Sequence, residues 1–182
     1  MINNKAIGLF DSGVGGLSVL NSLQNAFPTE EFIYIVDNQN APWGNKSKET
    51  LQDLTQHIIQ FLIKQDIKCL VIACNTTYSY LKEFIQSSID VPIINLLDEA
   101  CQDAISMSLN QRICVMATKG TISTHSHSDT IKSYHPSSSV HELSCPDLVQ
   151  YIEDNSIDIP ECQDKLRHYI LELTKFKADT LI

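Results

Sequence analysis

The sequence predicts an α/β fold built on parallel sheets, and three observations lead to this prediction. Short apolar runs of strand length alternate with longer segments of helical periodicity. The strand-like runs are mostly apolar throughout, as in parallel sheets that helices cover on both faces. Finally, Ile7–Gly16 resembles Ile113–Thr121, and Ile67–Ile72 resembles Phe176–Leu181. This weak repeat predicts two related halves joined near Asp98, although chance likeness between buried strands would produce the same pattern.

The first half is expected to contain four strands and three helices. The strands are expected at residues 6–10, 32–36, 69–73 and 92–97, and the helices at 17–26, 47–64 and 78–86. A glycine-rich turn is expected at 11–16 and an irregular stretch at 37–46. The helix at 47–64 is amphipathic, and its expected core face carries Leu51, Leu54, Ile58, Phe61 and Leu62.

The second half repeats the alternation. Strands are expected at 112–117, 140–143 and 178–182, with helices from the turn at 118–121 to about 134 and from about 162 to 175. The predicted domains are residues 1–97 and 98–182. Because the sequence stops at Ile182, inside an expected central strand, we expect the second domain to be incomplete, with exposed strand edge and low stability.

Composition narrows the class of protein. The chain has 182 residues, 13 Lys and Arg against 22 Asp and Glu, and a net charge of −9, which disfavours nucleic acid as a partner. No apolar run reaches membrane-spanning length, and no signal-peptide pattern is present, so we expect a cytoplasmic protein with no membrane partner. The six cysteines are scattered without a C-x-x-C pair, which favours reduced thiols over disulfides or a zinc site.

Three turns are expected at the carboxyl ends of the parallel strands, where ligands gather. They are Asp11-Ser12-Gly13, Pro42-Trp43-Gly44 and Cys74-Asn75-Thr76. The first leads into a helix and could hold a phosphate or a carboxylate. It also partly fits a dinucleotide-binding turn, but the third glycine position holds Ser18. Turn formation and helix capping are a simpler role for Asp11 and Ser12.

Cys74 follows a buried strand and precedes a helix, a position that can lower a thiol pKa and favour the thiolate. Asn75, Thr76 and Thr77 add hydrogen-bond donors for an anionic substrate beside it. The alternative is a buried small apolar residue, which explains Cys69, Cys101 and Cys114 better. His125 and His127 are expected on a solvated surface, and Glu153 on a helix surface.

Taken together, Ile7–Leu17, Asp37–Ser47 with its Ala-Pro-Trp-Gly run, and Val71–Thr76 resemble the glutamate racemases of the aspartate/glutamate racemase superfamily. The resemblance continues more weakly at Thr118–Thr121 and Cys145–Glu153. It implies two pseudo-symmetric, flavodoxin-like α/β domains with the active site between them. It also implies an isomerase, free of cofactor and metal, that interconverts L- and D-glutamate for peptidoglycan synthesis. Two cysteines would act on opposite faces of the substrate, and a homodimer is left open.

The resemblance also assigns roles to residues. Cys74 matches one of the two acid/base cysteines, Asp11 assists proton transfer and binds substrate, and Glu153 supports the second cysteine. The other implied substrate contacts are Ser12, Trp43, Gly44, Asn75, Thr76, Thr118 and Thr121.

The chain departs from the family pattern at several positions. Trp43 replaces a Tyr, Thr77 replaces a small residue, and Asn95–Glu99 stands in place of a Gly-Val-Ile-Glu-Pro-like run. The Gly-Cys-Thr-His motif of the second cysteine does not occur in the 182 residues. Cys145 and Cys162 are not expected to replace it, because neither has a strand-end context or a following Thr-His.

We therefore expect a glutamate racemase whose activity is impaired in this chain. The alternatives are a non-catalytic remnant that binds a dicarboxylate weakly or not at all, an aspartate racemase, and a dinucleotide-binding enzyme.

Overall fold

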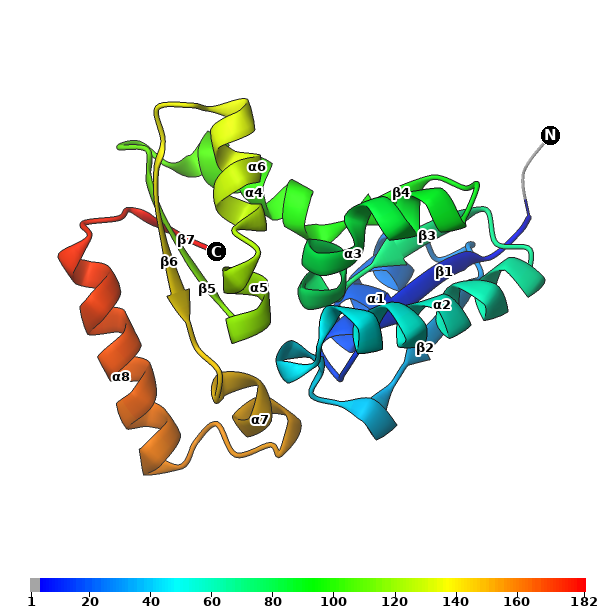
Figure 1. The fold of residues 1–182 in the computed structure, drawn as a ribbon, viewed down its shortest axis with the longest axis horizontal. Helices are drawn as coiled ribbons and strands as arrows, with labels where there is room; N and C mark the ends of the chain where they lie inside the picture. Colours follow the sequence, from blue (N-terminus) through cyan, green and yellow to red (C-terminus); the bar gives the residue numbers. More distant parts are fainter. Residues whose placement is uncertain (1–3) are drawn as a thin grey trace. The chain divides into compact units, whose positions relative to one another are not determined.

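Both sheets of the protein are entirely parallel, which confirms the predicted fold class (Figure 1). The computed structural model describes residues 4–182 and divides the chain after Leu96 into two compact units.

The sheet of the first unit has the strand order β2-β1-β3-β4. Its strands are β1 (Ile7–Asp11), β2 (Phe32–Val36), β3 (Cys69–Ile72) and β4 (Ile93–Asn95). Leu9 of β1 pairs with Tyr34 of β2 and with Val71 of β3, so β1 lies at the centre of the sheet. This order is the flavodoxin-like form of a doubly wound sheet, in which ligands bind at the carboxyl ends of the strands.

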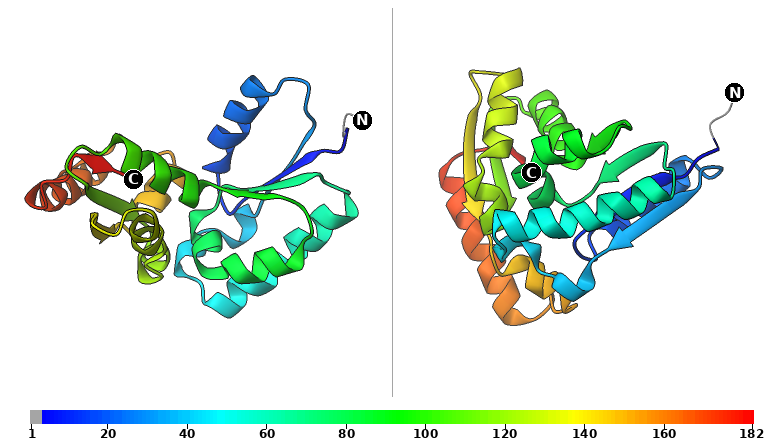
Figure 2. Two further views of the ribbon diagram at one scale, coloured as in Figure 1. Left: turned by 90° about the horizontal axis from the view of Figure 1, so that it is seen from above. Right: turned by 45° about the vertical axis from the view of Figure 1, so that its right-hand side comes forward.

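Helices cover both faces of this sheet. Figure 2 shows α1 (Gly16–Ala26) on one face and α2 (Lys48–Lys64) with α3 (Asn75–Ser88) on the other. Two short 3₁₀ turns, η1 (Asn38–Asn40) and η2 (Trp43–Asn45), occupy the expected irregular stretch. Helix α2 begins where Ser47 accepts a hydrogen bond from the backbone nitrogen of Thr50, a standard N-terminal cap.

The buried stripe of α2 differs from the expected one. Its buried residues are Leu51, Thr55, Ile59 and Leu62, whereas Phe61 is 47% exposed. Residues four or three apart lie above one another on a helix, so a stripe through Leu51 and Leu62 passes through Thr55 and turns Phe61 outward. The prediction was wrong for Phe61 because it followed apolar residue types, and Thr55 is polar.

The second unit repeats the central part of this topology. Its strands are β5 (Arg112–Ala117), β6 (Ser139–Ser144) and β7 (Thr180–Leu181), in the order β6-β5-β7. Strand β5 thus takes the place of β1, β6 that of β2, and β7 that of β3. The segments that resemble each other in sequence lead into or contain corresponding strands, which supports two related halves.

Five helices accompany the second sheet: α4 (Leu96–Met107), α5 (Lys119–Ser123), α6 (Ser126–Tyr134), α7 (Leu148–Glu153) and α8 (Pro160–Lys175). The expected strand at 92–97 ends at Asn95, and α4, which the sequence analysis did not predict, follows at once. The helix expected after residue 121 is divided, because His125 adopts a left-handed conformation with φ of 54° between α5 and α6.

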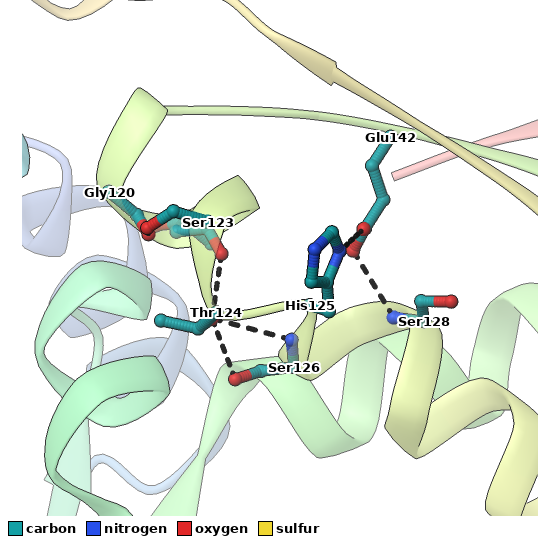
Figure 3. A network of polar contacts seen from close by, with 8 residues as sticks. Gly120, Ser123, Thr124, His125, Ser126, Ser128 and Glu142 are labelled. Atoms are coloured by element: carbon teal, nitrogen blue, oxygen red, sulfur yellow. Dashed lines mark hydrogen bonds and ion pairs between the residues drawn. The ribbon is translucent and has the colours of Figure 1, made fainter.

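His127 of α6 is buried, contrary to the expectation of a solvated surface. Burial lowers the pKa of its imidazole, while nearby Glu142 opposes this effect. Glu142 on β6 accepts a hydrogen bond from the backbone nitrogen of Ser128 and lies 2.7 Å from Nδ1 of His125 (Figure 3). Helix α6 therefore buries His127, while the side chain of His125 stays mostly exposed.

Strand β7 is held by a carboxylate at its start. The side chain of Asp179 accepts hydrogen bonds from Ser108 Oγ at 2.6 Å and from the backbone nitrogens of Leu109 and Asn110 at 2.8 and 2.9 Å. These bonds lower the pKa of Asp179 to about 2. They tie the loop after α4 to the beginning of β7.

Candidate active site

The carboxyl ends of β1 and β3 bring two of the three turns together. The backbone nitrogen of Ala73 donates to the carbonyl of Phe10, so the residues that follow the two strands lie side by side. As a result, Ser12 Oγ lies 3.1 Å from Cys74 Sγ, although 62 positions separate them in the sequence. The structure thus places Asp11, Ser12 and Cys74 at one edge of the first unit.

The sulfur of Cys74 is surrounded by hydrogen-bond donors. Cys74 is the N-terminal cap of α3, and its Sγ accepts from the backbone nitrogen of Thr77 at 3.4 Å and from Thr77 Oγ1 at 3.0 Å. Its side chain is only 4% exposed. Helix α3 begins at Asn75, earlier than expected, so the cysteine is part of the helix terminus itself.

The thiol pKa of Cys74 is nevertheless raised from its ordinary value. Burial is the larger cause and the negative charge of Asp11 the second, and together they outweigh the hydrogen bonds from Ser12 and Thr77. The donors at the helix terminus do favour the thiolate, but burial and Asp11 outweigh them, so the expected net lowering of the thiol pKa was wrong. At neutral pH the resting form is the thiol, which becomes a strong base once it is deprotonated.

Asp11 is the buried carboxylate of the site. Its Oδ2 accepts a hydrogen bond from the backbone nitrogen of Gly16 at 2.6 Å. A Cβ on Gly16 would lie 2.6 Å from Asp11 Cβ and 2.9 Å from Tyr34 Oη. Close packing therefore accounts for this glycine, and a carboxylate of the protein itself caps the start of α1. Both observations disfavour a dinucleotide phosphate at this turn.

The turn Pro42-Trp43-Gly44 contributes a buried aromatic residue that packs beside β1. Trp43 is 2% exposed, and its ring packs against Phe10 of β1 at a centroid distance of 5.3 Å and an interplanar angle of 55°. Its indole nitrogen is buried without a hydrogen-bond partner. Gly44 follows it and is half-buried.

Two further candidates occupy the first turn of α3. Asn75 is exposed, and Thr76 is buried. The first unit thus holds seven of the candidate residues near the carboxyl ends of its strands: Asp11, Ser12, Trp43, Gly44, Cys74, Asn75 and Thr76.

The remaining candidates belong to the second unit. Thr118 follows β5 and caps α5, where its Oγ1 accepts from the backbone nitrogen of Thr121 at 3.2 Å. The hydroxyls of Thr118 and Thr121 lie 3.1 Å apart, and Thr121 is buried. Glu153 is the last residue of α7 and is half-buried.

The structure changes the expectations for two residues near the strand ends: Thr77, which was expected to donate to a substrate, donates to the Cys74 sulfur itself, and Cys145 lies at the end of a strand. Thr77 donates its hydroxyl hydrogen to Cys74, and the signal that could have shown this is its place three residues after a helix cap. Cys145 directly follows β6, so it lies at a strand end, contrary to the expectation from the sequence. Burial raises its thiol pKa to about 11. In residues 4–182 no group of three or more His, Cys, Asp or Glu side chains is arranged to hold a metal ion.

Residues 7–182 of the chain match the family described as Asp/Glu/Hydantoin racemase. The chain is 35% identical over 178 residues to the glutamate racemase of Geobacter metallireducens, which covers 98% of this chain and 66% of that protein. It is 35% identical over 182 residues to the glutamate racemase of Clostridium novyi, covering 100% of this chain and 70% of the relative. The chain thus spans about two thirds of the length of the curated relatives that it matches.

Solved structures agree with the sequence comparison. A glutamate racemase isoform of Bacillus anthracis superposes with a TM-score of 0.93 at 31% identity, over 97% of this chain and 66% of that one. The glutamate racemase of Francisella tularensis in complex with D-glutamate gives a TM-score of 0.91 at 28% identity, over 98% and 67% of the two chains. These likenesses confirm the flavodoxin-like α/β architecture in two domains.

No helix within residues 4–182 is long and apolar enough to cross a membrane. The family match covers nearly the whole sequence, and about one third of the residues are identical to those of the relatives. The chain therefore belongs to the Asp/Glu/Hydantoin racemase family.

Proposed function

We propose that this chain is a glutamate racemase, an isomerase, and that Cys74 transfers the α-proton on one face of glutamate. The observation that carries the proposal is the position of the Cys74 sulfur, which lies at a helix terminus and a strand end among donors from Ser12 and Thr77. The relatives named glutamate racemases supply the substrate class.

The proposed step is a proton transfer between sulfur and carbon. The thiolate of Cys74 takes the α-hydrogen as a proton, and the C–H bonding pair stays on Cα and delocalises into the substrate carboxylate. Reprotonation by Cys74 returns the same enantiomer with its α-hydrogen exchanged, whereas inversion requires an acid on the opposite face to donate the proton there. Burial and Asp11 raise the pKa of the thiol, so that the thiolate is scarcer but more basic, as a weakly acidic Cα–H requires.

The other candidate residues would bind and orient the substrate. In the first unit these are Asp11, Ser12, Trp43, Gly44, Asn75 and Thr76. Thr118 and Thr121 would bind a carboxylate of glutamate, and Glu153 would support the second acid/base group. D-Glutamate is bound to the Francisella tularensis relative, which supports this choice of ligand.

The proposal extends to the cellular role. D-Glutamate made in this way would serve peptidoglycan synthesis in the cytoplasm, where Cys74 stays reduced. Residues 1–97 and 98–182 would be the two domains of the racemase, and a homodimer is compatible with the proposal.

The test is α-proton exchange in deuterated water, followed by NMR with glutamate and with aspartate. Cys74→Ser should slow the exchange by about 10²–10⁴-fold, the usual contribution of a positioned acid or base. Cys69→Ser is the matched control, because Cys69 lies at the other end of β3, and it should exchange at the wild-type rate. If only aspartate exchanges its α-proton, aspartate and not glutamate is the substrate. If neither amino acid exchanges, the proposal is overturned.

A further inference from the structure

We propose that Thr77 is a positioning residue whose hydroxyl holds the Cys74 sulfur and stabilises its deprotonated form. The inference rests on the proposed role of Cys74 and adds a residue to which neither the family match nor the motif comparison gives a part in the reaction.

The geometry places two donors of one residue on the same sulfur. Thr77 Oγ1 donates to Cys74 Sγ at 3.0 Å, and the backbone nitrogen of Thr77 donates to it at 3.4 Å. Thr77 is completely buried, so water does not compete for its hydroxyl. Thr77 lies in the first turn of α3, so the helix fixes its position relative to Cys74. Little additional conformational entropy is therefore lost when its two donors bind the sulfur.

The number of hydrogens distinguishes the two protonation states. A thiol carries one hydrogen, which Ser12 Oγ at 3.1 Å is placed to accept. After deprotonation the hydroxyl of Ser12 can turn and donate instead, so the thiolate would receive three bonds, two of them from Thr77. Hydrogen bonds to a charged group are stronger than those to a neutral one, so Thr77 favours the thiolate.

Burial and the charge of Asp11 disfavour the Cys74 thiolate, so the hydrogen bonds from Thr77 are needed to oppose them. Within the first unit, Asp11 of β1 is the charged group that acts on the sulfur, and burial adds to its effect. Tyr34 of β2 is also ionisable at this turn, and its hydroxyl donates to the carbonyl of Gly13. Burial and Asp11 both favour the neutral thiol, so the donors from Ser12 and Thr77 are what oppose them.

The experiment compares three threonine variants by their thiolate content. Thr77→Val removes the hydroxyl and keeps the branched shape, and Thr77→Ser restores a hydroxyl. Thr55→Val is the matched control, because Thr55 is also a buried helical threonine of the first unit but its hydroxyl has no partner. Thiolate is followed against pH by ultraviolet absorbance and by the ¹³Cβ signal of labelled cysteine, with Cys74→Ser as the reference that identifies Cys74.

We expect Thr77→Val to reduce the thiolate fraction of Cys74 at a fixed pH by about tenfold, the effect of losing one hydrogen bond to a charged group. Thr77→Ser should recover most of it, and Thr55→Val should titrate as the wild type does. If Thr77→Val fails to fold, Thr77→Ala keeps the backbone donor and should show the same loss.

An unchanged titration in folded Thr77→Val or Thr77→Ala would overturn the inference, and so would a Thr77→Ser variant that titrates like them. No glutamate is used, so the result is independent of the proposed function. Normal α-proton exchange with an unchanged titration would reject only the role of Thr77. A shifted titration without any exchange would reject only the racemase.

Discussion

The carboxylate of Asp11 lies 2.6 Å from the backbone nitrogen of Gly16, and this contact folds the glycine-rich turn back onto the end of β1. It occupies a donor at the start of α1 that an external anion would otherwise use. It also keeps a negative charge close enough to raise the pKa of Cys74. One side chain thus shapes the turn and tunes the candidate acid/base residue.

Replacing Gly16 should disrupt this turn. In Gly16→Ala the new Cβ would lie 2.6 Å from Asp11 Cβ, and we expect a loss of about 1–3 kcal/mol in unfolding free energy, typical of overpacking. Gly15→Ala is the control, since its Cβ would meet only Asp11 Oδ2 at 3.4 Å. Urea denaturation measures both variants, and equal stability of the two would refute the packing argument.

Removing the charge of Asp11 should make Cys74 more acidic. Asn at this position keeps an oxygen for the Gly16 nitrogen but has no negative charge, so the thiolate is no longer repelled. We expect Asp11→Asn to lower the pKa of Cys74, opposite to the effect of Thr77→Val, in the same thiolate titration. A raised pKa would show that the hydrogen bond of Asp11, rather than its charge, controls the thiol.

Asp179 should make the second unit sensitive to acid. Its folded pKa of about 2 lies below the ordinary value of 3.8, so its stabilising contribution is present above 3.8 and is lost as the pH falls toward 2. Asp179→Asn should lower the melting temperature at neutral pH, because an amide cannot accept all three bonds, and the difference from wild type should shrink in acid. Asp158→Asn changes an exposed aspartate and serves as the control. A deficit that stays constant with pH would contradict this account.

Much of the fold could be predicted from residue patterns. Strands β2 and β5 lie where they were expected, because their apolar runs are bounded by polar residues. Helix α4 was missed because Ile93–Leu97 is apolar except for Asn95, so the whole run was assigned to one strand. The signal for α4 was present in Asp98 and Glu99, which favour a helix N-terminus, and in the spacing of Leu97, Cys101 and Ala104.

The site could be predicted only as a set of turns. The turns were expected at the carboxyl ends of the strands, but the approach of Ser12 to Cys74 was not predicted, because it follows from the parallel pairing of β1 with β3. The protonation of Cys74 could not be predicted, since it depends on burial and on the distance to Asp11, which only tertiary structure determines. The same reason applies to His127, whose polar neighbours in sequence do not show which way α6 faces.

In the proposed reaction Cys74 acts on one face of the substrate, and this restricts the exchange that depends on it. A sulfur fixed at one face reaches the α-hydrogen of a single enantiomer, so the Cys74-dependent exchange should favour either D- or L-glutamate.

The most direct measurement is the initial rate of α-deuterium incorporation into D- and L-glutamate, each taken alone, for the wild type and for Cys74→Ser. The account predicts that the exchange lost in Cys74→Ser is confined mainly to one enantiomer and amounts to about 10²-fold or more. Exchange in Cys74→Ser at the wild-type rate for both enantiomers would contradict it.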